Sequence, residues 1–144
     1  MSIFVLPVRV YYEDTDHGGV VYYANYLKFM ERCRTEFLRS HGFEQDVLID
    51  ENDLIFAVRR IEADYLQPAR FNDMLLVTAQ IIQKSRVKIL FKQQVYKTLV
   101  GQQQITTDSV LLCDAKVTIV SLNTASMRPK RMPENILEEL MSEY

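Results

Sequence analysis

The chain has 144 residues, of which 48% are hydrophobic and 25% charged, which is the composition of a folded globular domain and excludes a disordered chain. We treat residues 1–144 as a single domain. The net charge of −2 argues against nucleic-acid binding, because such binding needs a dense cationic face. No apolar run approaches the roughly 20 residues that cross a bilayer, and no export signal is evident at the N-terminus. We therefore expect a cytoplasmic protein.

The first half of the chain predicts a strand, a loop and a long helix. β-forming residues dominate Pro7–Glu13, which we expect to be the first strand. The polar segment Asp14–Gly19 ends in two glycines and has the composition of a loop. From about Tyr23 to His41 the apolar residues follow helical spacing, and Gly42 is a natural helix stop.

The second half of the chain is mostly an alternation of apolar and polar residues, which predicts strands. After an acidic connection over Phe43–Asp53, we expect four strands, the first of them irregular at Arg59-Arg60. Their ranges are Leu54–Leu66, Met74–Gln83, Val87–Val95 and Leu111–Ile119. We expect short links between the last three strands, which favour antiparallel pairing. The tail from Pro133 has the apolar stripe of a short amphipathic helix.

Together these elements predict an α+β fold, with a five-stranded antiparallel sheet, one long helix and a short C-terminal helix. One helix can cover only one face of such a sheet. Several strands also carry apolar residues on the other face, for example Val110, Leu112 and Val120. Because an uncovered apolar face would be too large for a monomer, we expect a homo-oligomer that pairs across a two-fold axis.

The segment Tyr11–Tyr26 concentrates groups that can carry chemistry. It contains the carboxylates of Glu13, Asp14 and Asp16, then Gly-Gly, then the expected start of the helix. Free N–H groups at a helix N-terminus favour developing negative charge. Acyl transfer needs one group that attacks or activates water and another that stabilises the oxyanion. From the residues alone, an acyl-transfer site and an acidic turn that caps a helix both remain open.

The sequence argues against a calcium site and against a metal or redox site built from cysteines. The spacing of the acidic residues and Gly19 is similar to a calcium loop, but the twelfth position is Asn25 instead of a bidentate Glu. Cys33 and Cys113 match no metal or redox motif, so we expect reduced, buried thiols.

The same residues resemble a known family. The motifs YEDTD (12–16), GVVY (19–22), NY (25–26), ER (31–32) and RTE (34–36) are similar to those of hotdog-fold thioesterases of the 4-hydroxybenzoyl-CoA type. Within that family the chain most resembles the YbgC type, which is encoded with the bacterial Tol–Pal envelope system. Weaker matches extend the resemblance over nearly the whole chain, at DY (64–65), PAR (68–70), SR (85–86) and RP (128–129).

The resemblance implies an activity and two catalytic groups. The reaction is hydrolysis of an acyl-CoA thioester to a free acid and coenzyme A, with no metal or redox cofactor and with coenzyme A only as part of the substrate. Asp16 is the implied catalytic carboxylate, either as nucleophile or as general base for water. The implied oxyanion donor is the backbone N–H of Tyr23, which stands where the Tol–Pal-associated group usually has His.

The resemblance also suggests residues that bind the substrate. Gly19 would let the backbone approach the thioester, and Asp14 would orient the loop. Tyr22 is a candidate for lining an acyl channel, with core packing as the alternative. Arg86 and Arg128 are candidates for the phosphates of coenzyme A, with ordinary solvated charges as the alternative.

Members of this family form homodimers with a continuous ten-stranded sheet, often doubled to homotetramers, with active sites at the dimer interface. We expect the same assembly here. The expected ligand is an acyl-CoA substrate and not a nucleic acid, and the resemblance suggests peripheral association with inner-membrane lipid-synthesis proteins. A hotdog enoyl-CoA hydratase or dehydratase is a rival, but His17 directly follows Asp16, which is the wrong spacing for its His–carboxylate pair. A non-catalytic acyl-CoA- or partner-binding hotdog protein is the other rival, and the presence of Asp16 weighs against it.

Overall fold

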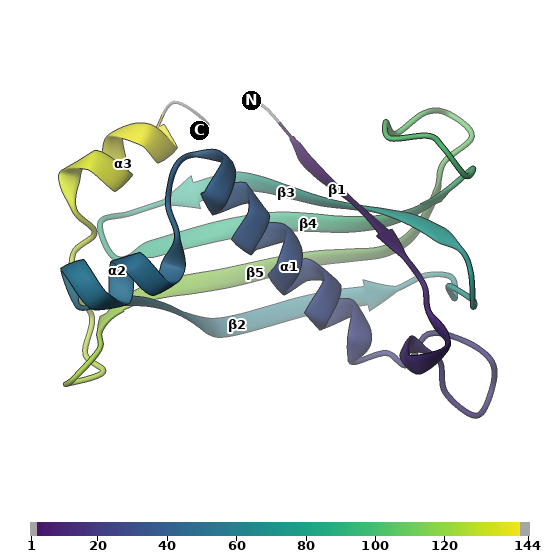
Figure 1. The fold of residues 1–144 in the computed structure, drawn as a ribbon, viewed down its shortest axis with the longest axis horizontal. Coiled ribbons are helices and arrows are strands. Elements are labelled where there is room, and N and C mark those ends of the chain that lie inside the picture. Colours follow the sequence, from purple (N-terminus) through teal and green to yellow (C-terminus); the bar gives the residue numbers. More distant parts are fainter. Residues whose placement is uncertain (1–2, 142–144) are drawn as a thin grey trace.

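The structure, a computed structural model, describes residues 3–141 and consists of one sheet, three α-helices and a short 3-10 helix (Figure 1). In chain order the elements are β1 (Phe4–Arg9), η1 (Tyr12–Asp14), α1 (Asn25–Ser40), α2 (Gln45–Asn52), β2 (Leu54–Tyr65), β3 (Met74–Lys84), β4 (Lys88–Thr98), β5 (Val110–Asn123) and α3 (Glu134–Met141). None of the described helices is long and apolar enough to cross a membrane.

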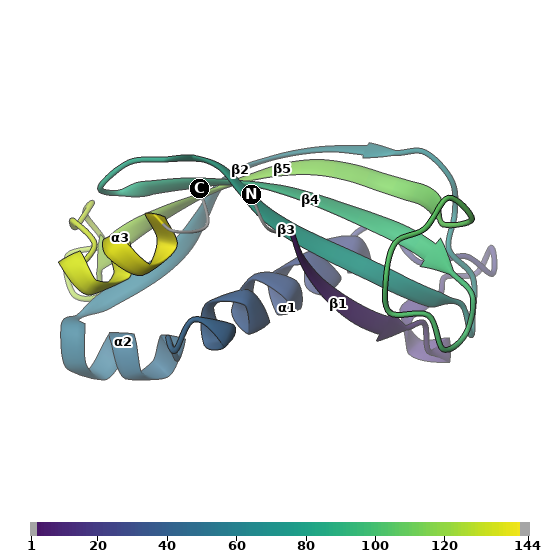
Figure 2. The same ribbon diagram turned by 90° about the horizontal axis from the view of Figure 1, so that it is seen from above.

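The five strands form one antiparallel sheet in the order β1-β3-β4-β5-β2. The sheet curves around α1, which lies along its concave side (Figure 2). This arrangement confirms the predicted fold. Because β2 is the last strand of the sheet, only one of its edges is paired within the chain.

The long helix α1 is held by one apolar face, as its spacing predicts. Its buried side chains recur every three or four residues: Tyr26, Phe29, Met30, Cys33, Arg34, Phe37 and Leu38. Gly42 adopts a φ of +87°, a left-handed conformation that suits glycine just after a helix end. The buried face places α1 against β1 and β3 with its N-terminus beside the polar loop, and this orientation positions the site described below.

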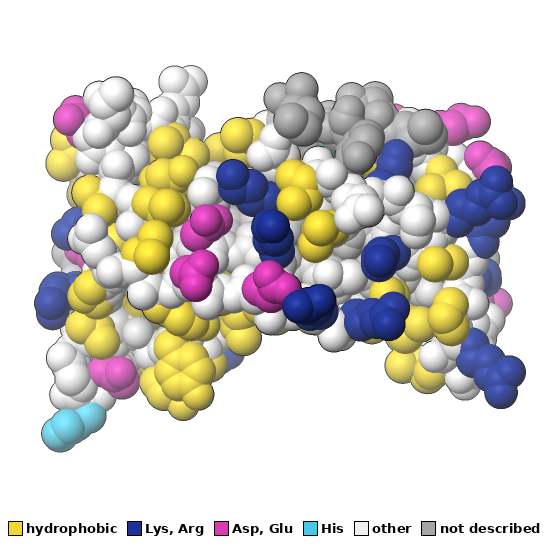
Figure 3. All heavy atoms as spheres, turned by 180° about the vertical axis from the view of Figure 1, so that it is seen from behind, with side chains coloured by type: hydrophobic (Ala, Val, Ile, Leu, Met, Phe, Trp, Pro, Cys, Tyr) yellow, Lys and Arg dark blue, Asp and Glu magenta, His cyan; other side chains and the backbone are white. Residues whose placement is uncertain are grey.

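The two faces of the sheet differ more than the sequence pattern suggests. On the concave face, β3 buries the expected residues Leu75, Val77, Ala79 and Ile81. The convex face carries lysine, arginine and carboxylate side chains scattered among apolar ones (Figure 3). Of the residues expected there, Val110 is exposed and Val120 is half-buried, whereas Leu112 is buried with the main core beside a register shift between β4 and β5, so this face is mixed in character. Exposed apolar residues also lie along the free edge strand, at Val58, Ile61 and Tyr65.

Three local predictions need correction, and one is confirmed. β1 ends at Arg9 because Tyr12–Asp14 turn into η1. The segment Phe43–Asp53, predicted as a connection, contains α2, whose apolar pattern is weak because only Leu48 is buried. The link between β4 and β5 is long, running from residue 99 to residue 109. The irregularity predicted in β2 is confirmed as a register shift between Val58 and Arg60.

Candidate functional site

The loop that follows η1 is a tight turn closed by its own backbone. The Asp16 N–H donates to the Val20 carbonyl at 2.8 Å, and the Gly19 N–H donates to the Asp16 carbonyl at 3.0 Å. Gly19 has a φ of +81°, a conformation that glycine adopts without the strain other residues meet there. The loop is anchored to the sheet side by the Val21 N–H, which donates to the Ala69 carbonyl at 2.8 Å. The glycine pair therefore sets how Asp16 is presented.

The Asp16 side chain is exposed, with one of its two oxygens held. Oδ1 accepts a hydrogen bond from the Gly18 N–H at 2.8 Å. Oδ2 has no hydrogen-bond donor within residues 3–141. The carboxylate borders a shallow hollow lined by Tyr12, Thr15, His17, Gly19 and Phe71. A carboxylate with one fixed and one free oxygen can attack a carbonyl carbon or accept a proton from water.

Asp14 has contacts that position the loop. Its Oδ2 accepts from the Tyr11 N–H at 2.8 Å, which ties the carboxylate back to the end of the preceding segment. Its backbone carbonyl accepts from the Tyr22 N–H at 3.0 Å and from the Asn25 side-chain amide at 2.8 Å. These bonds join the start of the loop to the start of α1. They suit the predicted role of orienting the loop.

The first turn of α1 leaves backbone donors unused. The Asn25 N–H donates to the Tyr22 carbonyl at 2.8 Å, and Ala24, the N-cap residue, makes no side-chain cap. In the described part of the chain, the N–H groups of Tyr23 and Ala24 have no acceptor. Such free donors at a helix N-terminus stabilise negative charge, which is the property required of an oxyanion site.

Tyrosine rings surround this helix start. The Tyr65 hydroxyl donates to the Tyr23 carbonyl at 3.2 Å, and its ring meets the Tyr23 and Tyr26 rings edge-on. Tyr26 is buried, and its hydroxyl oxygen accepts from the Ala69 N–H at 3.0 Å. Burial raises the pKa of Tyr26, so this phenol stays neutral. Tyr22 is 45% exposed, so core packing, the alternative for this residue, is wrong.

Arg86 and Arg128 lie far from Asp16 within one chain. β3 begins beside the loop, since Val20 pairs with Arg70 in an isolated bridge, and its 11 residues then span about 36 Å at roughly 3.3 Å per residue. The turn between β3 and β4, which contains Arg86, lies at the opposite end of the sheet from this loop, as the course of β3 in Figure 1 shows. The structure does place the segments of Arg86 and Arg128 in the same region, because the Met132 N–H donates to the Arg86 carbonyl at 2.9 Å.

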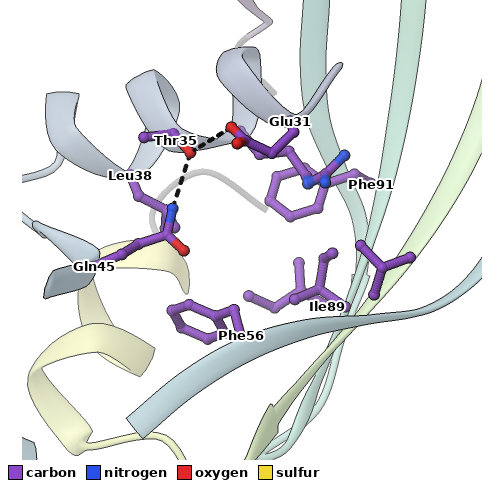
Figure 4. A pocket seen from close by; sticks show the side chains of 10 residues that line it. Glu31, Thr35, Leu38, Gln45, Phe56, Ile89 and Phe91 are labelled. Carbon is purple, nitrogen blue, oxygen red and sulfur yellow. Dashed lines mark hydrogen bonds between the residues drawn. The ribbon is translucent and has the colours of Figure 1, made fainter. Parts of the chain in front are cut away.

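A second group of polar residues escaped the sequence reasoning. Arg34 lies on the buried face of α1, and its Nη1 donates to the Gln93 side-chain oxygen at 2.8 Å. Arg34 is one of the residues that line a cavity between α1 and the sheet, which Figure 4 shows. The signal was present in the sequence. A polar residue interrupts an apolar face twice, at Arg34 in the helix and at Gln93 in the strand that contains Phe91 and Val95.

The described residues contain no group of three or more His, Cys, Asp or Glu side chains that could hold a metal ion. Cys33 and Cys113 are both buried and free, as expected. Burial raises the pKa of Cys33 to about 12 and that of Cys113 to about 11, so both thiols are protonated and unreactive at neutral pH.

Residues 18–99 match the Thioesterase superfamily. The acyl-CoA thioester hydrolase YbgC of Escherichia coli is 39% identical over 138 residues, which cover 96% of each chain. A probable thioesterase from Bartonella henselae superposes with a TM-score of 0.79 at 33% identity, over 92% of this chain and all of the other. A mutant 4-hydroxybenzoyl-CoA thioesterase, complexed with 4-hydroxybenzoyl-CoA, shares the fold with a TM-score of 0.83 at 18% identity, over 95% of this chain and 97% of that one.

Proposed function

Because the chain belongs to the thioesterase superfamily, we propose that it hydrolyses an acyl-CoA thioester to a free acid and coenzyme A, with Asp16 as the reacting carboxylate. One observation carries the assignment of Asp16. Its Oδ1 is fixed by the Gly18 N–H, and its Oδ2 is free, one short loop before the unused N–H groups of the α1 start. The attacking carboxylate and the backbone N–H groups that would stabilise the oxyanion therefore belong to one continuous segment of the chain.

Two routes use the same carboxylate. As a nucleophile, Asp16 attacks the thioester carbon, the carbon–sulfur bond breaks, and coenzyme A leaves as a thiolate that takes up a proton. Water then hydrolyses the resulting mixed anhydride and restores Asp16. As a general base, Asp16 takes a proton from the water that attacks the thioester carbon, the carbon–sulfur bond then breaks, and the proton passes to the departing thiolate of coenzyme A. Both routes consume one water and need no metal or redox cofactor, with coenzyme A entering only as part of the substrate.

The oxyanion donor we propose is the backbone N–H of Tyr23. That donor has no acceptor within residues 3–141, so it is available to the thioester oxygen. Preorganised backbone donors of this kind stabilise the charge that develops in the transition state without having to reorganise. Because the donor is a backbone group, the tyrosine side chain at this position does not remove it. Tyr23 is 60% exposed.

We further propose a homodimer that pairs the free edges of two β2 strands. This edge carries exposed Val58, Ile61 and Tyr65, and antiparallel pairing about a two-fold axis would bury them. The same pairing would bring the Tyr65 end of one β2 beside the Phe56 end of the other. The Asp16 loop of one copy would then lie beside the end of the second copy's sheet where the cavity between α1 and the sheet is found. There the partner subunit's Arg86 and Arg128 would be candidates for binding the coenzyme A phosphates.

The described part of the chain places no carboxylate in ion-pair range of Arg86 or Arg128, so both guanidinium groups are available to phosphate.

Further assembly to a tetramer and association with inner-membrane lipid-synthesis proteins stay predictions from the resemblance, as does a cytoplasmic location.

The test is thiol release from a panel of short, long and aromatic acyl-CoA substrates. Asp16→Asn keeps the shape of the side chain but removes the charge, and we expect kcat to fall by about 10²–10⁴-fold. Glu13→Gln is the matched control, since Glu13 is an exposed carboxylate in the same segment, and it should retain activity. Full activity in Asp16→Asn would contradict the assignment. Sedimentation velocity on both variants should show the same dimeric species.

A further inference from the structure

A cavity of about 300 Å³ lies between the second half of α1 and the sheet (Figure 4). Its sheet side is apolar and is formed by Phe56, Val58, Ile89, Phe91 and Ile119. Its helix side is mostly polar and includes Glu31, Arg34, Thr35 and Gln45. At about 30 Å³ for a water-sized group, it has room for about ten such groups, which suits a short chain with one polar end.

Arg34 is the unusual residue of this wall. Its side chain is only 9% exposed, yet no carboxylate of the described residues lies within ion-pair distance of it. Its only hydrogen bond there runs from Nη1 to the neutral Gln93 amide oxygen. Gln93 is itself fixed in place, because its Nε2 donates to the Met30 carbonyl at 3.1 Å and to the Thr78 carbonyl at 3.2 Å. The guanidinium is therefore held rigidly without a counter-charge.

The remaining N–H groups of Arg34 are open to the cavity. A guanidinium has five N–H donors, and the bond to Gln93 uses one of them. Among the described residues, no fully buried side-chain nitrogen lacks a partner, so the other nitrogens of Arg34 are not sealed within the protein. Since Arg34 lines the cavity, its free donors are accessible to a ligand there.

The nearest acid does not neutralise this charge. Glu31 is exposed, and its Oε2 accepts a hydrogen bond from the Thr35 hydroxyl at 3.0 Å, along the helix. It interacts with Arg34 only from beyond ion-pair distance. An uncompensated buried charge is costly, and a carboxylate held by the guanidinium fork compensates it with two parallel hydrogen bonds.

We propose that this cavity receives the far end of the acyl group and that Arg34 selects acyl groups ending in a carboxylate. The inference rests on the proposed function and its dimer. α1 has 16 residues and is about 24 Å long at 1.5 Å per residue, with Asp16 before its start and the cavity along its second half. Within one copy the two are far apart. Pairing of the β2 edges brings the loop of one copy to the cavity of the other.

The direct test compares two five-carbon substrates, glutaryl-CoA and valeryl-CoA, which differ in the carboxylate at the far end. We expect kcat/KM to favour glutaryl-CoA by about tenfold to hundredfold in the native protein, the range for a charge-assisted hydrogen bond. Arg34→Met should remove this preference. Arg32→Met is the matched control, because Arg32 is an exposed arginine of the same helix, and it should keep the preference. A native ratio near one, or a preference kept in Arg34→Met, would overturn the inference.

Calorimetry with free glutarate and free valerate keeps the inference testable if Arg34→Met fails to fold. Glutarate should bind the native protein at least about tenfold more tightly than valerate. Equal binding of the two acids would overturn the inference. The two proposals fail differently. Absence of thiol release from every acyl-CoA overturns the proposed function, whereas hydrolysis of acyl-CoA with no preference for glutaryl-CoA overturns only the role of Arg34.

Discussion

The two ends of α1 are built in different ways. At its N-terminus, Asp16 is exposed, and the hydrogen bonds that shape its turn join residues only a few positions apart, such as Asp16 and Gly18. Along its second half, Arg34 is buried, and its partner Gln93 lies 59 positions away in the chain. A local turn can present a reactive group without supporting the core. A buried polar pair is part of the core, so changes there should alter stability first.

The largest expected effect on stability is at the buried end. Gln93→Leu removes the acceptor of the Arg34 guanidinium and the donor to the Met30 and Thr78 carbonyls. Losing the partner of the Arg34 guanidinium, together with one hydrogen bond to each carbonyl, should lower the free energy of unfolding by about 2–3 kcal/mol. Urea unfolding followed by circular dichroism measures the change.

Gln94→Leu is the control for Gln93→Leu. Gln94 is the next residue, half-buried on the opposite face, and bonds to Asp114 and Tyr96. We expect it to cost less than about 1 kcal/mol, since water can replace its bonds. Equal losses in the two variants would break the distinction between the two regions.

A smaller effect, on activity, is expected at the exposed end. A Cβ added at Gly18 would lie 3.2 Å from Asp16 Oδ1, so Gly18→Ala should shift the carboxylate and lower kcat/KM by about tenfold with little loss of stability. If Gly18→Ala lowers stability and leaves kcat/KM unchanged, the loop has a structural role only.

A Cβ at Gly19 would contact nothing within 4 Å, but the backbone φ of Gly19 is +81°, so Gly19→Ala should lower the free energy of unfolding by about 1 kcal/mol.

A further effect, which appears only as the pH approaches and passes 9, concerns the two buried thiols. Burial raises the pKa of Cys33 to about 12 and that of Cys113 to about 11, above the ordinary value of 9.0. Their contribution to stability is therefore complete below pH 9. It is lost as the pH rises from 9 towards 11 and 12, because the unfolded chain then releases these protons while the folded chain keeps them.

Urea unfolding at pH 8, 9 and 10 should therefore show a falling free energy of unfolding. The double variant Cys33→Ala/Cys113→Ala should show a shallower decline, which isolates the thiols from the tyrosines and lysines that titrate in the same range. An identical slope in the double variant would contradict the assignment. Neither thiol of the folded protein should react with a disulfide reagent at pH 8.

Much of the architecture was accessible from the sequence because it depends on neighbouring residues. The apolar spacing in α1 predicted its buried face, and the alternation in β3 predicted which of its residues point inward. The Gly-Gly turn before a helix start, together with the family resemblance, pointed to Asp16 and Tyr23. Predictions that needed more than local pattern were less accurate. α2 was missed because only Leu48 is buried in it, and the convex face proved mixed in character.

The sequence by itself determined the helix, the strands and a loop that presents a carboxylate, since periodicity and turn chemistry act over a few residues. Only the tertiary structure decided that Arg34 meets Gln93, that a cavity opens between α1 and the sheet, and that Arg86 lies at the opposite end of β3 from Asp16. These facts depend on how strands far apart in the chain pair and on how the helix packs across them. No local pattern records those distances.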